Sequence, residues 1–265
     1  MRSGTIIERR LYPSPNPRIR IEEVTYQSGP YRVKGLLAIP KRKGRYSSII
    51  YFRGGIQSLG TVRPARIAQY ASYGFIVFAP FYRGNRGGEG RDEFVGDDRL
   101  DAISAVDVLK QIEWTNGHIH IVGYSRGGAM ACWTAIAREE VTTATIWAGM
   151  SDIVATYFER IDMRRMMKRL IGKSPNSNSS GYRERNPLSE LYRVRCPFLI
   201  VHGKRDQNVS IAQSYRLEAL LRAEQKEVAT IYFETYDHFL PNVIGRTLIR
   251  HMTAWMKSEE NRLGR

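Results

Sequence analysis

The chain carries a serine, an aspartate and a histidine, in that order, at the ends of three predicted strands. Ser125 lies in Gly123-Tyr124-Ser125-Arg126-Gly127, between an apolar run at 119–122 and a helical run at 129–137. In this strand–turn–helix setting, the pattern G-x-S-x-G lifts a serine hydroxyl above the end of a parallel sheet. A serine hydroxyl becomes a good nucleophile only beside a base. We therefore predict a nucleophile at Ser125, the plain alternative being a serine that caps the following helix.

The base predicted for Ser125 is His238, which follows the strand expected at 228–233. Its loop belongs to the carboxyl edge of the sheet, where Ser125 also emerges. The other histidines lie at a strand entry, beside the predicted acid in an expected structural role, or inside a helix: His118, His120, His202 and His251.

The acid predicted to orient His238 is Asp206, in the loop after the strand expected at 198–202. A carboxylate bonded to one ring nitrogen fixes the tautomer and stabilises the imidazolium as it forms. Two alternatives stay open. Asp152 follows the strand after Ser125, and Asp237 adjoins the base but is too near in sequence to turn back easily onto the ring.

Acyl transfer also requires donors for the oxyanion. In a sheet of this kind one donor is the backbone N–H after the nucleophile, here that of Arg126. The second comes from the loop after an earlier strand, Arg53-Gly54-Gly55-Ile56. We predict the N–H of Gly55, because a glycine allows close approach; a plain glycine turn is the alternative.

Strand-like and helix-like segments alternate from about residue 47, and a hairpin is expected around Gly29-Pro30. This alternation predicts an α/β protein with a mostly parallel sheet of about eight strands and helices on both faces. Helices are expected at 64–73, 97–114, 127–138, 210–225 and 241–257. We expect one domain over 1–265.

Residues 150–195 interrupt the alternation and predict a short cap insertion near the active site. They include an amphipathic helix with a cationic face around Arg164 to Lys173. If the insertion covers Ser125, it contributes to an acyl pocket. The residues predicted to line that pocket are Tyr124, Ile56, Phe158 and Met163.

Composition limits the function classes. The 265 residues are 42% hydrophobic and carry a net charge of +15 spread along the chain, which favours a basic surface over a nucleic-acid site. Two cysteines form no disulfide framework, and no secretory signal or membrane span is visible. We expect a cytoplasmic protein with no nucleic-acid partner and no transmembrane segment.

Several linked motifs together resemble the catalytic domain of the prolyl oligopeptidase family, within the α/β-hydrolase superfamily. They are Arg53-Gly54-Gly55, Tyr82-Arg83-Gly84, the acidic helix Asp97…Asp107, Gly123 to Gly128, His202-Gly203-x-x-Asp206-x-x-Val209, and His238. The resemblance implies the α/β-hydrolase fold, triad roles for Ser125, Asp206 and His238, and oxyanion roles for Gly55 and Arg126. Some 45 residues precede the first parallel strand, so no propeller is expected, and Arg53 replaces the usual histidine.

These observations predict a serine hydrolase that cleaves a small-molecule ester through an acyl-enzyme on Ser125. The alternatives are a serine peptidase of the prolyl oligopeptidase type acting on short peptides or aminoacyl amides, and a non-catalytic protein of this fold that binds an anionic partner. No metal and no organic cofactor are expected. Ser125 rather than cysteine argues against dienelactone-hydrolase chemistry. The sequence does not specify an oligomeric state.

Overall fold

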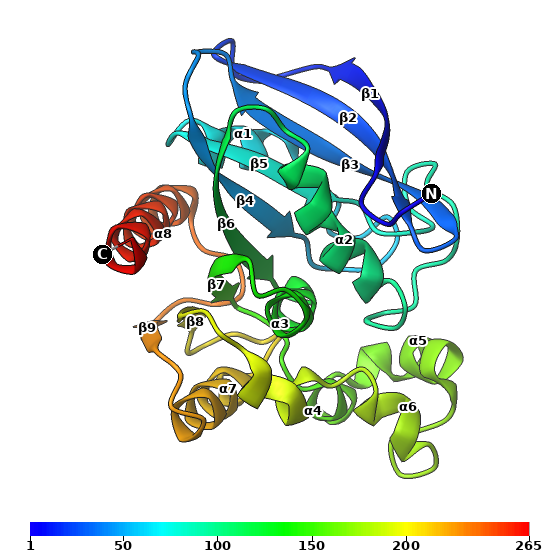
Figure 1. Cartoon of the computed structure of the whole chain (residues 1–265). Coiled ribbons are helices and arrows are strands. Elements are labelled where there is room, and N and C mark those ends of the chain that lie inside the picture. Colours follow the sequence, from blue (N-terminus) through cyan, green and yellow to red (C-terminus); the bar gives the residue numbers. More distant parts are fainter. Residues whose placement is uncertain (265) are drawn as a thin grey trace.

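A single nine-stranded sheet organises the chain (Figure 1). The computed structural model describes residues 1–264. Strands β4 to β9 are parallel, whereas β1, β2 and β3 add an antiparallel edge next to β5. The strand order is β1-β2-β3-β5-β4-β6-β7-β8-β9. The bounds are β1 (Ile6–Tyr12), β2 (Ile19–Ser28), β3 (Tyr31–Pro40), β4 (Tyr46–Phe52), β5 (Phe75–Pro80), β6 (Thr115–Tyr124), β7 (Val141–Trp147), β8 (Phe198–Gly203) and β9 (Val228–Phe233).

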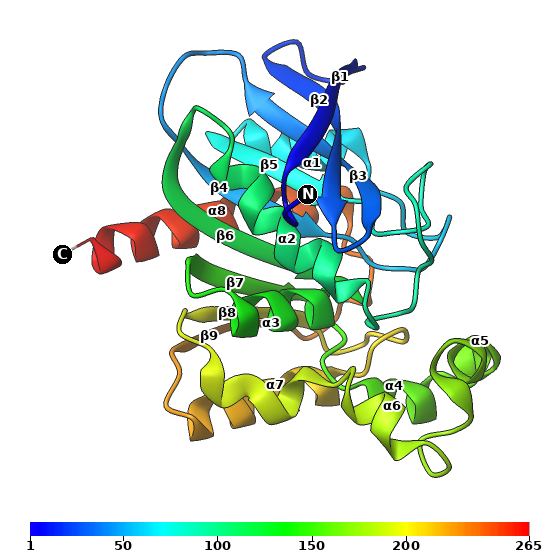
Figure 2. The same ribbon diagram turned by 45° about the vertical axis from the view of Figure 1, so that its right-hand side comes forward.

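Helices cover both faces of this sheet. One core holds the buried residues of α2 (Arg99–Lys110), α3 (Gly127–Ala137) and α7 (Ile211–Ala223). The other holds those of α1 (Pro64–Ala71) and α8 (Asn242–Leu263). Figure 2 shows α2 and α3 side by side on one face, and β1 at the margin of the sheet. The α/β-hydrolase fold predicted from the sequence is confirmed.

Alternation along the central strands produces the two cores. In β4, Ile50 and Phe52 face one core, while Ile49 and Tyr51 face the other. Successive side chains of a strand point to opposite faces, so a parallel strand covered by helices on both sides is apolar throughout. This is why the apolar runs marked the parallel strands in the sequence.

One strand was not predicted. Strand β1 pairs with β2 at the edge of the sheet, and most of its side chains are exposed. Its centre is the charged run Glu8 to Arg10, and its apolar residues Ile7 and Leu11 are exposed, so it lacks the apolar alternation that marks a half-buried strand. The observed sheet therefore has nine strands rather than about eight. The helix expected at 97–114 is also shorter, Arg99–Lys110, and closes near Gln111.

The chain between β7 and β8 forms several short helices in place of one. They are α4 (Ile153–Glu159), η1 (Ile161–Met163), α5 (Arg164–Met167), η2 (Lys168–Gly172), α6 (Ser179–Arg183) and η3 (Pro187–Arg193). Figures 1 and 2 both show α4, α5 and α6 grouped at one end of the molecule. The cationic segment around Arg164 to Lys173, predicted as one helix, is thus divided between α5 and η2, with Met167 and Ile171 buried.

Both cysteines lie in the core as free thiols. Cys132 and Cys196 are free and buried, and burial raises the pKa of each to about 12. Among residues 1–264, every helix is too short or too polar to span a bilayer.

Phe78 provides a test of the core. Its ring is fully buried in β5 and packs edge-on against Tyr26, with centroids 5.5 Å apart. Phe78→Ala leaves a cavity beneath α2 and should lower the free energy of unfolding by about 3–5 kcal/mol in urea titrations. Leu11→Ala on β1, where the side chain is 81% exposed, is the control and should change it by less than about 0.5 kcal/mol.

Candidate active site

The turn at Ser125 has a left-handed backbone, with φ of 55°. The turn forms only because the flanking glycines carry no side chain. A Cβ at Gly127 would lie 2.1 Å from the carbonyl oxygen of Phe52, and one at Gly123 would lie 2.2 Å from that of Gly127. Backbone hydrogen bonds from Ser125 to Trp147, and from Gly128 and Met150 to Ser125, hold the turn in place. A non-glycine residue in this conformation stores strain that the packing around it must sustain.

The predicted acid and base are hydrogen-bonded to each other. Nδ1 of His238 lies 2.7 Å from Oδ2 of Asp206, and both side chains are buried. Tyr124 links this pair to Ser125, its neighbour in the chain: its ring centroid lies 5.1 Å from that of His238, and its hydroxyl donates to the carbonyl of His238 at 3.1 Å. Asp152, the alternative acid, instead caps α4 and bonds Asn186 and Arg216.

Asp206 is held as a carboxylate. Burial by itself would raise its pKa, but hydrogen bonds from His202 and His238 and from the N–H of Val209 outweigh burial and lower the pKa well below its usual range. The second oxygen, Oδ1, accepts from the N–H groups of Asn208 at 2.7 Å and Val209 at 2.9 Å. Asp206 therefore keeps its negative charge at neutral pH.

Asp237 joins the loops of the acid and the base. Its Oδ1 accepts from the N–H of Gln207, the residue that follows Asp206 in the acid loop, at 3.0 Å. Gly203 allows the loops to pack, since a Cβ there would lie 2.2 Å from the carbonyl oxygen of Tyr236. Asp237 is thus placed to fix the loops rather than to orient the ring.

The loop after β4 lies against the serine. A Cβ at Gly54 would lie 2.6 Å from Cβ of Ser125 and 3.2 Å from its Oγ. Gly55 follows with φ of 66°, and among residues 1–264 the N–H groups of Gly55 and Arg126 donate to no protein acceptor. Two unengaged N–H groups beside a serine are what an oxyanion hole requires.

The side chain of Arg126 is buried beneath the turn. Its guanidinium forms a bidentate ion pair with the carboxylate of Asp92, at 2.6 and 3.2 Å, and lies 3.7 Å from Asp98. Its guanidinium also stacks over the ring of Tyr82, at 4.9 Å from the centroid. Arg126 thus ties the serine turn to the loop between β5 and α2.

The buried side chain of Arg53 fixes the loop after β4, which we call the glycine loop. Its guanidinium donates to the carbonyls of Gly54, Leu59 and Phe81 at 3.0–3.3 Å. Burial, with repulsion from Arg126, lowers the pKa of Arg53 to about 10. The hydroxyl of Tyr82 donates in turn to the carbonyl of Arg53 at 3.3 Å.

The predicted pocket residues differ in their surroundings. Tyr124 touches His238, as described. Ile56 and Met163 are half-buried against the core, and Phe158, 49% exposed, packs edge-on against Tyr157. The segment after β7 does reach the acid loop, because Arg160 donates to the carbonyl of Asn208 at 3.0 Å. An acyl pocket formed by Ile56, Phe158 and Met163 stays a prediction.

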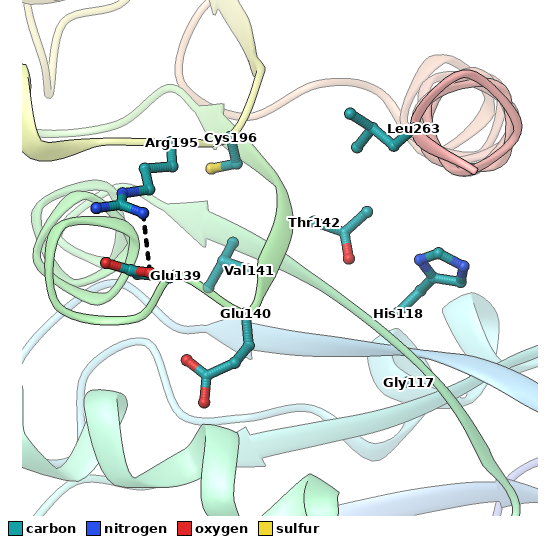
Figure 3. A pocket seen from close by; sticks show the side chains of 9 residues that line it. All are labelled: Gly117, His118, Glu139, Glu140, Val141, Thr142, Arg195, Cys196 and Leu263. Atoms are coloured by element: carbon teal, nitrogen blue, oxygen red, sulfur yellow. Dashed lines mark hydrogen bonds and ion pairs between the residues drawn. The ribbon is translucent and has the colours of Figure 1, made fainter. Parts of the chain in front are cut away.

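A hollow of about 430 Å³ lies at the amino-terminal ends of the parallel strands, away from Ser125 (Figure 3). Its walls include the starts of β6 and β7 and an exposed ion pair between Arg195 and Glu139. Ser125 follows the other end of β6, so this hollow does not belong to the candidate active site. Among residues 1–264, no group of three or more His, Cys, Asp or Glu side chains is placed to hold a metal ion.

Sequence reasoning missed the buried charges around Arg126. Asp92 and Asp98 lie in and after a glycine-rich, charged segment that reads as a surface loop. The signal in the sequence was the arginine inside the G-x-S-x-G motif, because the side chain of Arg126 is buried beneath the serine turn. A buried arginine needs carboxylates nearby, but their position in the sequence does not follow from that.

The chain is similar to members of one enzyme family. Residues 61–261 match the model of the prolyl oligopeptidase family. The chain is 47% identical over 255 residues to the uncharacterized peptidase YtmA of Bacillus subtilis, covering 96% of this chain and 99% of the relative. It is 25% identical to dipeptidyl-peptidase 5 of Porphyromonas endodontalis, covering 80% of this chain but 34% of that protein.

Two solved structures share the fold. The puromycin-hydrolyzing peptidase of Mycobacterium tuberculosis superposes with a TM-score of 0.77 and 24% identity, covering 94% of this chain and 40% of that one. The acetyl xylan esterase of Paenibacillus sp. R4 superposes with a TM-score of 0.76 and 17% identity, covering 93% and 88%. Peptidases and esterases are thus both found among the structural relatives.

Asp98 provides a pH-dependent test of the buried cluster. Burial raises its pKa to about 7, against attraction from Arg126, and its Oδ1 has no partner within residues 1–264. Because the folded-state pKa lies above the unfolded value, the contribution of Asp98 to stability is complete below about pH 4 and is lost as the pH rises through 7. Relative to Asp98→Asn, the wild type should lose roughly 1 kcal/mol per pH unit across this window. Urea unfolding of both proteins at pH 5 and pH 8 measures it; an equal difference at both pH values would contradict the assignment.

Proposed function

Since this chain belongs to the prolyl oligopeptidase family of serine hydrolases, we propose that it cleaves acyl bonds through a covalent intermediate on Ser125. The observation that carries this proposal is the hydrogen bond between His238 and Asp206 at 2.7 Å, linked through Tyr124 to a strained serine turn. The family alone gives the class of enzyme. The roles of individual residues are our proposal.

The geometry supports a division of roles. Nδ1 of His238 is engaged by Asp206, so Nε2 is the nitrogen left to remove the proton from Ser125 Oγ. The alkoxide forms a bond to the carbonyl carbon, and the carbonyl oxygen takes the negative charge. The N–H groups of Gly55 and Arg126 are proposed to bind that oxygen.

Collapse of the intermediate completes the first half of the reaction. The leaving group takes the proton from His238 Nε2 and departs as an alcohol or an amine. Water then attacks the acyl-enzyme and loses its proton to the same nitrogen. The second tetrahedral intermediate collapses by breaking the bond between the carbonyl carbon and Ser125 Oγ, which takes the proton back from Nε2 as the carboxylic acid leaves. Asp206 stays ionised throughout, which suits it to stabilise each imidazolium.

We propose amide bonds of short peptides or aminoacyl compounds as the scissile bonds, with esters as a second candidate. Family membership and the 47%-identical peptidase relative favour amides. The ester prediction from the sequence finds support in the acetyl xylan esterase likeness, which extends over 88% of that protein. A serine enzyme able to expel an amine also cleaves an activated ester, because the alkoxide is a better leaving group.

Replacing the nucleophile tests the central step. Ser125→Ala should lower kcat for p-nitrophenyl acetate by about 10⁴-fold or more and abolish labelling by a fluorophosphonate probe. Ser179→Ala, on the exposed surface of α6, is the matched control and should behave as wild type. Wild-type protein that resists the probe would favour the alternative of a non-catalytic protein that binds an anionic partner.

The bond preference needs a separate comparison. Wild type should hydrolyse both p-nitrophenyl acetate and an aminoacyl p-nitroanilide, with both activities lost in Ser125→Ala. Values of kcat/KM for the ester and amide carrying one acyl group measure the preference. Ester turnover without measurable anilide turnover, across apolar and basic aminoacyl groups, would exclude the peptidase candidate.

A further inference from the structure

Asp206 binds a second imidazole. His202 is the penultimate residue of strand β8, and its side chain is completely buried. Its Nε2 lies 3.0 Å from Oδ2 of Asp206, the same oxygen that His238 reaches at 2.7 Å. The ring is fixed on its other side as well, with Nδ1 lying 2.6 Å from the hydroxyl of Ser214 on α7.

The partners of His202 determine where its proton lies. Nε2 also lies 3.0 Å from the carbonyl oxygen of Val209, an atom that can only accept. Nε2 therefore carries hydrogen and donates toward both Val209 and Asp206. Ser214 provides either a donor or an acceptor at Nδ1, so this assignment holds in both charge states of the ring.

As a result, the carboxylate of Asp206 has donors on both oxygens. Oδ1 takes two backbone N–H groups, while Oδ2 is shared between the two imidazoles. Two consequences follow. The plane of the carboxylate is fixed before substrate arrives, and the negative charge on Oδ2 is divided between His202 and His238.

We propose that His202 is a positioning residue that acts on the base through Asp206, an inference that rests on the proposed triad. By donating to Oδ2, His202 weakens the attraction of that oxygen for the imidazolium of His238. It thereby sets the lower end of the pH range in which His238 can remove a proton.

Two charged groups on the segments next to Asp206 and the two imidazoles are bonded to backbone atoms. The acid loop contributes Asp206 and the base loop contributes Asp237, which bonds backbone N–H groups. Arg160 approaches from the segment after β7 and bonds the carbonyl of Asn208. On β9, Tyr232 pairs in register with His202 and directs its hydroxyl to Glu218 of α7.

Three substitutions separate orientation from simple packing. In His202→Gln the side-chain amide can reach the place of Nε2 and keep a donor to Asp206. His202→Phe fills the ring volume without a donor, and His202→Asn is polar but reaches only the place of Nδ1. His251→Gln, at an exposed histidine of α8, is the matched control.

The readout is the pH profile of kcat/KM for p-nitrophenyl acetate. In the Phe and Asn variants we expect kcat/KM at pH 7 to fall about tenfold and the midpoint of the acidic limb to rise by roughly 0.5–1 pH unit. The Gln and His251→Gln variants should keep the wild-type midpoint. A loss of activity without movement of the midpoint, or a midpoint moved equally in Gln and Phe, would overturn the proposal.

Stability is checked by thermal unfolding of each variant. If Phe and Asn fail to fold while Gln folds, His202 serves stability alone and the proposal is likewise overturned. The underlying function is tested separately by Ser125→Ala. Turnover retained in Ser125→Ala would refute the proposed triad itself. Turnover lost in Ser125→Ala, together with an unmoved midpoint in the His202 variants, would refute only the role of His202.

Discussion

The close approach of backbone at the serine turn is the constraint on which the rest of the site depends. The turn at Ser125 passes so near the end of β4 that the backbone at Gly127 leaves no room for a side chain. Hydrogen bonds to β7 and to the residues after it hold the turn from the other side. Strain of this kind persists only where surrounding structure over-determines the conformation, and here three adjacent parallel strands do so.

Buried charge reinforces that packing. Arg126 follows the serine and could not remain buried without Asp92, whose carboxylate meets it at 2.6 Å. The same aspartate lies 3.7 Å from Arg53, which holds the glycine loop. A buried ion pair contributes little net stability compared with apolar packing, but loss of one partner leaves an uncompensated charge. The cluster therefore fixes the relative positions of two loops and the serine turn.

The two edges of the sheet have different roles. The carboxyl edge gathers the serine turn, the acid loop and the base loop, because all the strands that precede them are parallel. The amino edge carries structural contacts, such as His120 between Thr143 and Glu260. The bond between His120 and Glu260 attaches the C-terminal part of α8 to the sheet. Loops at one edge can thus vary while the other edge secures the helices.

Much of the fold could be read from the sequence, since buried parallel strands are apolar throughout and amphipathic helices repeat every three to four residues. Strand β1 could not, because an exposed edge strand has no apolar pattern to detect. The residues between β7 and β8 were recognised as an interruption of the alternating strands and helices, but their division into several short helices was not predicted.

For the site, local sequence determined which groups carry chemistry and where the turns fall, because glycine spacing and strand ends are properties of neighbouring residues. Tertiary structure decided between the candidate partners of the triad and set all the partners of the buried arginines. The bond between Asp206 and His238 spans 32 residues, the pair of Arg126 and Asp92 spans 34, and His202 reaches Ser214 on another element. Such pairings depend on how strands stack and loops fold back, and the same carboxylate could equally have served a turn. Distances in space, unlike spacing along the chain, are set only when the whole core packs.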